Sequence, residues 1–111
     1  MESTWQFADE PTWTPSEKKT ARRAFDGAFE RHCATIAEEA RRMLGAAPCE
    51  IWRVHDYLSE QREAVDRIYD YRYSVLLYVF ARLIRDGWLT EADLAGLQQE
   101  KIARIKHVAG L

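Results

Sequence analysis

The chain has 111 residues, of which 47% are hydrophobic and 31% charged, and its net charge at pH 7 is −2. This length fits one domain, although a chain this short buries a limited share of its surface and would gain from a partner subunit. The charge balance argues against a nucleic-acid binder, which shows a concentrated basic face, and the longest apolar run, residues 75–81, is too short to span a bilayer.

The N-terminus is acidic and lacks a signal-peptide pattern, and two cysteines do not make a disulfide framework. We therefore expect a reduced, cytoplasmic setting. Residues 1–13 show no sustained periodicity and are predicted to form an irregular arm. Aromatic residues in the arm favour docking, on the protein's own core or on a partner, so Trp13 is a candidate N-terminal contact.

A first long helix is predicted to begin at Pro15, because Thr14 can cap it and Glu17 completes a capping box. Apolar residues then recur at helical spacing until Gly45. About 30 residues of helix would measure about 45 Å, so this rod needs another long helix to lie against.

A second helix is predicted from Pro48 to about Asp70, and residues 70–73 form either a bend or its continuation. Its apolar face comprises Ile51, Val54, Leu58, Val65, Ile68 and Tyr69.

A third helical stretch covers residues 74–86 and is apolar nearly all round at its start, which indicates burial on several sides. Gly87 is its predicted C-terminal glycine, with Trp88 and Leu89 folding back. A fourth helix is predicted to begin at Thr90. The predicted core of this part comprises Val75, Leu76, Val79, Phe80, Leu83, Leu94 and Leu97.

Three basic residues, Lys101, Arg104 and Lys106, lie toward the C-terminal end of this last helix. They serve either the helix dipole and solubility or the docking of an acidic partner. No segment shows strand alternation, so residues 14–111 are predicted to form a single all-α domain. Long antiparallel helices form its elongated body, and the remainder forms a small helical head.

A second surface follows the second helix, away from its apolar face. Trp52, His55, Asp56, Ser59 and Arg62 share an arc of about 120°, centred roughly 115° from the apolar face. Tryptophan and arginine are typical of interface hot spots. Asp56 and Arg62 could pair across a two-fold axis, while Arg62 has a local alternative in Asp66. We expect a homodimer with Ile51, Trp52, His55 and Arg62 at or near the two-fold contact; the alternative is a solvated charged face.

Neither catalysis nor metal binding fits this surface well. His55 and Asp56 are neighbours in sequence and point about 100° apart on a helix, and a helix face makes a poor water-excluding site. The residues His32, Cys33, Cys49 and His55 lack the close paired spacing of structural zinc sites. We therefore expect no enzyme activity and no metal.

The segments "IWRVHDYLSEQR", "YDYRYSVLLYVFARLIRDGWL" and "KIARIKHV" resemble the Fluorescence Recovery Protein family. "PTWTPSE" is also similar to the start of that family's first helix, and the resemblance covers roughly residues 13 to 108. It implies an all-helical homodimer without a cofactor, which binds the photoactivated orange carotenoid protein of cyanobacteria, mainly through the C-terminal domain of that protein. Binding speeds its return to the inactive orange form and helps it leave the phycobilisome, so that antenna fluorescence recovers.

The family's functional strip matches Trp52, His55, Asp56 and Arg62, at or beside the dimer interface. Tyr78 and Arg104 fall where the family uses an aromatic and a basic residue on the head, although both match imperfectly. A cyanobacterial source would imply a place at the thylakoid or phycobilisome face. The alternatives are a family-like helical adaptor for a different protein, in a bacterium without phycobilisomes, and a small acid–base enzyme.

Overall fold

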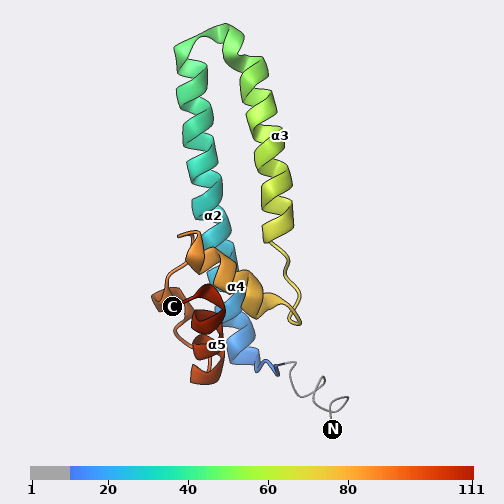
Figure 1. Ribbon diagram of the computed structural model, residues 1–111, viewed down its shortest axis with the longest axis vertical. Coiled ribbons are helices and arrows are strands. Elements are labelled where there is room, and N and C mark those ends of the chain that lie inside the picture. Colours follow the sequence, from blue (N-terminus) through green and yellow to red (C-terminus); the bar gives the residue numbers. More distant parts are fainter. Residues whose placement is uncertain (1–10) are drawn as a thin grey trace.

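The computed structural model describes residues 11–111 of the chain, and every regular element there is helical. Two long helices, α2 (Pro15–Ala46) and α3 (Ile51–Ile68), form an antiparallel hairpin joined by the short 3₁₀ helix η1 (Pro48–Glu50) (Figure 1). The molecule measures 61 × 28 × 26 Å. The predicted all-α class and the long first helix are confirmed.

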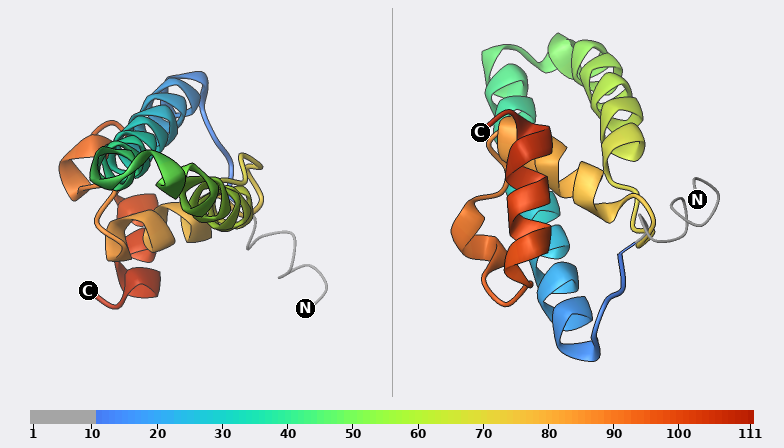
Figure 2. Two further views of the ribbon diagram at one scale, coloured as in Figure 1. Left: turned by 90° about the horizontal axis from the view of Figure 1, so that it is seen from above. Right: turned by 60° about the horizontal axis from the view of Figure 1, so that its bottom comes forward.

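A compact head packs against the N-terminal half of α2, as Figures 1 and 2 show. It consists of α4 (Leu76–Arg85), the 3₁₀ helix η2 (Glu91–Leu94) and α5 (Gln99–Ala109). Small residues of α2 let the head approach closely, since Ala21 and Ala28 are completely buried. Of the predicted core residues Val75 is only partly buried, while the others are buried: Leu76, Val79, Phe80, Leu83, Leu94 and Leu97.

The start of α2 is joined to α5 by a buried ion pair. Thr14 and Glu17 form the predicted capping box, in which each backbone N–H donates to the other side chain at 3.1 Å. Glu17 also accepts hydrogen bonds from the backbone N–H of Gln98 (2.9 Å) and from Lys101 Nζ (3.1 Å). Solubility and the docking of an acidic partner, two roles considered for Lys101, both require an exposed side chain, but this lysine is buried.

Trp13 takes the first of its two predicted alternatives and packs in the protein's own core. Its side chain is 8% exposed, its ring lies 5.5 Å from that of Tyr73, and Lys101 Nζ lies 5.0 Å from its centroid. Lys101 Nζ also donates to the Thr12 carbonyl at 2.6 Å, which ties residues 12 and 13 to α5. Residues 1–10 of the predicted arm lie outside the described residues.

The second helix is shorter than predicted. Pro48 opens the 3₁₀ turn η1, and the α-helix runs from Ile51 to Ile68. Residues 70–73 form the bend rather than a continuation, since α3 ends at Ile68 and α4 begins at Leu76.

The end of α4 is as predicted. Gly87 adopts a φ of +87°, and the Trp88 N–H donates to the Leu83 carbonyl at 2.9 Å. Leu89 folds back and is buried, while Trp88 is partly buried against the same core.

The predicted continuous helix from Thr90 was wrong. Thr90 does cap a helix, but that helix is the 3₁₀ turn η2, and α5 begins only at Gln99. Between them the chain turns at Gly96, whose φ is +117° and whose position a Cβ could not occupy, because it would lie 2.6 Å from Thr20 Oγ1. Burying both Leu94 and Leu97 against α2 thus overrides the helical spacing.

Candidate functional site

The predicted strip on α3 is exposed along its length. Trp52 is 72% exposed, and His55, Asp56, Ser59 and Arg62 are all exposed. A tryptophan in this state leaves a large apolar surface in water, which is typical of a protein interaction site.

The polar groups of the strip make few internal contacts. His55 Nδ1 lies 3.3 Å from Asp56 Oδ1, and both side chains are more than two-thirds exposed. Arg62 takes the local alternative, since its Nε donates to both carboxylate oxygens of Asp66 at 3.1 and 3.2 Å. Within residues 11–111 these bonds use only Nε, so both amino groups of the guanidinium keep donors for another acceptor. An exposed pair on a convex helix suits recognition better than proton transfer.

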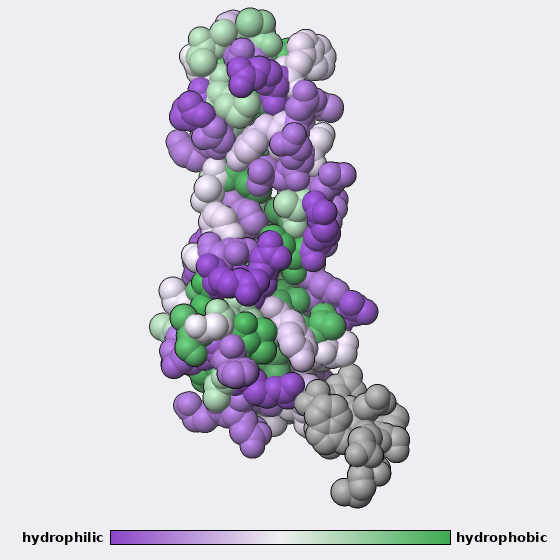
Figure 3. All heavy atoms as spheres, in the orientation of Figure 1, coloured by the Kyte–Doolittle hydropathy of each residue, from purple (hydrophilic) through white to green (hydrophobic). Residues whose placement is uncertain are grey.

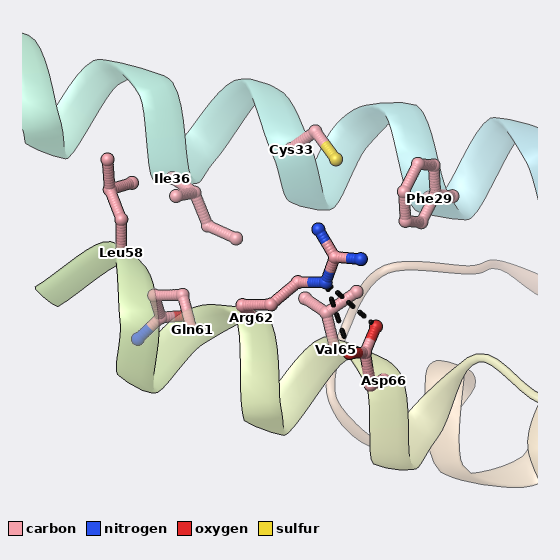
Figure 4. A pocket seen from close by; sticks show the side chains of 8 residues that line it. All are labelled: Phe29, Cys33, Ile36, Leu58, Gln61, Arg62, Val65 and Asp66. Carbon is pink, nitrogen blue, oxygen red and sulfur yellow. Dashed lines mark hydrogen bonds and ion pairs between the residues drawn. The ribbon is translucent and has the colours of Figure 1, made fainter. Parts of the chain in front are cut away.

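A groove of about 390 Å³ runs between α2 and α3 beside the strip. Figure 4 shows Arg62 extending from α3 into this groove, toward Cys33 and Phe29 on α2. Arg62 therefore stands at the border between the outward strip and the groove. The lining residues are Phe29, Cys33, Ile36, Leu58, Gln61, Arg62, Val65 and Asp66.

Several residues predicted to face the core are exposed along the hairpin instead. Phe29 is 40%, Leu58 42% and Ile51 46% exposed, and of the apolar face of α3 only Val54 and Val65 are buried within the helix. Figure 3 shows apolar surface between the two helices, flanked by polar side chains. Sequence periodicity identified these positions as apolar. It cannot tell whether the surface that packs against them belongs to the same chain or to another one.

The two candidate head residues lie on different helices. Tyr78 is 52% exposed on α4, beside a shallow pocket that it shares with Arg67 and Arg82. Arg104 is half-buried on α5. The head and the hairpin strip are thus separate surfaces of one elongated molecule (Figure 1).

Contacts that sequence analysis did not predict join the hairpin to the head. The His32 ring on α2 stacks on Trp88 at 4.1 Å with an interplanar angle of 12°, and its Nδ1 lies 3.1 Å from Tyr69 Oη. Burial lowers the pKa of His32 below its ordinary value, although Asp86 acts in the opposite direction. Burial also raises the pKa of Tyr69 to about 12. The neutral His32 ring therefore connects the end of α3 to the turn that follows α4.

Among residues 11–111 no group of three or more histidine, cysteine or acidic side chains could hold a metal ion. In the same range no helix is both long enough and apolar enough to cross a membrane. His32, Cys33, Cys49 and His55 do not form such a group in the described part of the chain.

The sequence profile of the photoprotection regulator fluorescence recovery protein matches residues 13–109 of this chain. The chain belongs to the fluorescence recovery protein family. The fluorescence recovery protein of Synechocystis sp. (strain PCC 6803) is 33% identical to it over 110 residues, which cover 96% of this chain and 98% of that protein.

Solved structures of the family share the fold. The fluorescence recovery protein of Fremyella diplosiphon is 37% identical, with a TM-score of 0.82, and that of Synechocystis sp. PCC 6803 is 29% identical, with a TM-score of 0.81. Both comparisons cover 90% of this chain and 100% of the solved chain. The resemblance seen in the sequence is thereby confirmed, and with it the assignment to a family of photoprotection regulators.

Proposed function

We propose that this protein binds the photoactivated, red form of an orange carotenoid protein and accelerates its return to the inactive orange form. It acts without covalent chemistry and in the cytoplasm. The observation that carries the proposal is the exposed strip of Trp52, His55, Asp56 and Arg62, on a chain that belongs to a family of photoprotection regulators.

Acceleration of this kind follows from differential binding. A protein that binds the transition state of a partner's relaxation more tightly than its red form speeds that relaxation. A hundredfold acceleration needs about 2.7 kcal/mol of such a difference. A few charge-assisted hydrogen bonds, such as those that the Arg62 amino groups can donate, are of this magnitude.

We further propose that the working form is a homodimer, in which the strip and the adjoining groove lie at or near the two-fold axis. Apolar side chains along the hairpin support this arrangement, because Phe29, Ile51, Trp52 and Leu58 are each at least 40% exposed. The head, with Tyr78 and Arg104, would then contact the C-terminal domain of the carotenoid protein from outside the dimer interface.

The test measures the absorbance decay of the red form in darkness, with and without this protein, across several orange carotenoid proteins. We expect faster decay, and we expect Arg62→Leu to reduce the acceleration about tenfold, since one charge-assisted hydrogen bond contributes about 1.5 kcal/mol. Arg62→Lys should also impair it, because lysine keeps the charge but not the planar fork.

The matched control is Arg53→Leu, on the same helix, where an exposed arginine pairs with Glu50 at 2.9 Å outside the strip. It should act like the unchanged protein. If no carotenoid protein relaxes faster while the Synechocystis fluorescence recovery protein works alongside, the function is wrong, and the chain is an adaptor for another partner.

A further inference from the structure

One turn near the middle of α2 holds the segment that follows α4. The sequence neighbours Arg31 and His32 lie near the middle of this helix, and both contact the segment that follows α4. His32 holds the ring of Trp88, while Arg31 holds its backbone carbonyl.

The Arg31 guanidinium joins both ends of the segment 88–93. Its Nη1 donates to the Trp88 carbonyl at 2.7 Å and to Asp93 Oδ2 at 3.1 Å, and its Nη2 donates to Asp93 Oδ1 at 3.2 Å. The Asp93 carboxylate also accepts from the backbone N–H of Thr90 at 2.9 Å. One side chain of α2 therefore fixes a loop that lies about sixty residues further along the chain.

The ion pair of Arg31 and Asp93 contributes little to the stability of the fold, and its geometry instead suits a role in orienting the segment 88–93. The Arg31 and Asp93 side chains are 49% and 25% exposed, and ion pairs of this exposure contribute about 0–1 kcal/mol. Their bidentate geometry is nevertheless specific, because a planar fork meets the carboxylate in one orientation. Beside it lies an open groove of about 410 Å³ between α2 and η2, so that without this clamp the segment 88–93 has free space on one side.

We propose that Arg31 is a positioning residue, which fixes the segment 88–93 on α2 and so sets the orientation at which Tyr78 on the head engages the partner. This inference rests on the proposed function. A partner that relaxes by bringing two parts together is accelerated more by a protein whose contacts to both parts are held at a fixed spacing. A loosened head would still bind the carotenoid protein, but it would stabilise the transition state of the relaxation less.

The test compares Arg31→Met and Asp93→Asn with the control Arg41→Met. Arg41 pairs with Glu38 on the same helix and is 71% exposed. Asparagine at position 93 keeps an oxygen for the Thr90 cap, so a defect shared by both variants reports on the clamp itself. We expect each to lower the maximal acceleration at saturating protein at least fivefold, with the half-saturating concentration changed less than twofold.

Hydrogen exchange of the unliganded protein gives a readout that does not depend on the carotenoid protein. Amides of residues 88–94 should exchange about tenfold faster in both variants, while those of 54–65 in α3 stay unchanged. Full acceleration by Arg31→Met would overturn the proposal, and so would unchanged exchange in 88–94. If the unchanged protein accelerates no carotenoid protein, the proposed function fails, and the exchange experiment alone decides whether Arg31 fixes the head.

Discussion

At the scale of single residues, the buried pair of Glu17 and Lys101 decides how the head is attached to the start of α2. Burial alone would raise the pKa of Glu17, but hydrogen bonds from the backbone of Gln98 and Thr14 and from Lys101 outweigh it and lower this pKa. Removing one member of such a pair leaves the other charge buried without its partner, which costs far more than the pair itself contributes.

We expect Lys101→Met to lower the free energy of unfolding by about 3 kcal/mol, since that is the usual cost of breaking a buried pair. The control is Lys106→Met, whose ion pair with Glu91 is largely exposed, with an expected cost below about 1 kcal/mol. Urea unfolding monitored by circular dichroism measures both. Equal losses in the two variants would show that the buried pair of Glu17 and Lys101 does not stabilise the attachment of the head.

His32 makes stability depend on pH near neutrality. Its folded-state pKa lies below the ordinary value of 6.5, so the unfolded chain binds more protons as the pH falls through that value. Stability is therefore complete above about pH 6.5 and decreases below it. The carboxyl groups of Glu17 and Asp93, whose pKa values are lowered, act only at more acidic pH.

In His32→Phe, which keeps an aromatic ring against Trp88, the loss of stability between pH 7.5 and 5.5 should become smaller. Replacing the exposed His107 in the same way serves as the control. The measurement is urea unfolding at each pH, and an unchanged slope in His32→Phe would rule out His32 as its origin.

At the scale of elements, the turn between η2 and α5 is the place where backbone geometry outweighs helical periodicity. Gly96→Ala should cost about 1–3 kcal/mol, because the residue has a φ of +117° and its Cβ would meet Thr20 Oγ1. Gly45→Ala, near the end of α2 with nothing within 4 Å of the added Cβ, should instead be neutral or stabilise by up to about 1 kcal/mol. Thermal unfolding of the two variants decides, and a neutral Gly96→Ala would contradict the close approach.

At the scale of the whole molecule, the hairpin leaves large apolar side chains in water, since Ile51, Trp52 and Leu58 are each more than 40% exposed. A homodimer would cover them. We predict that Ile51→Glu gives monomers with intact helices, because burying an unpaired carboxylate in the interface is expensive. Sedimentation at micromolar concentration is the measurement, and Tyr78→Glu on the head is the control that should remain dimeric. A dimeric Ile51→Glu would place the interface elsewhere.

The sequence by itself determined the helical class, the start of α2, the turn at Gly87 and the separate polar strip on α3. These features depend on local rules: capping boxes, glycine at helix ends and the helical period act within a few residues. The composition of the strip, with the segments around it, was also enough to indicate the family.

Only the tertiary structure decided the break at Gly96, the burial of Lys101 and the clamp of Arg31 and His32 on residues 88–93. Each depends on partners distant in sequence, 84 residues apart for Glu17 and Lys101 and 62 for Arg31 and Asp93. A lysine at helical spacing looks the same in sequence whether water or a buried carboxylate surrounds it. The difference arises only when packing brings the two segments together and removes the water between them.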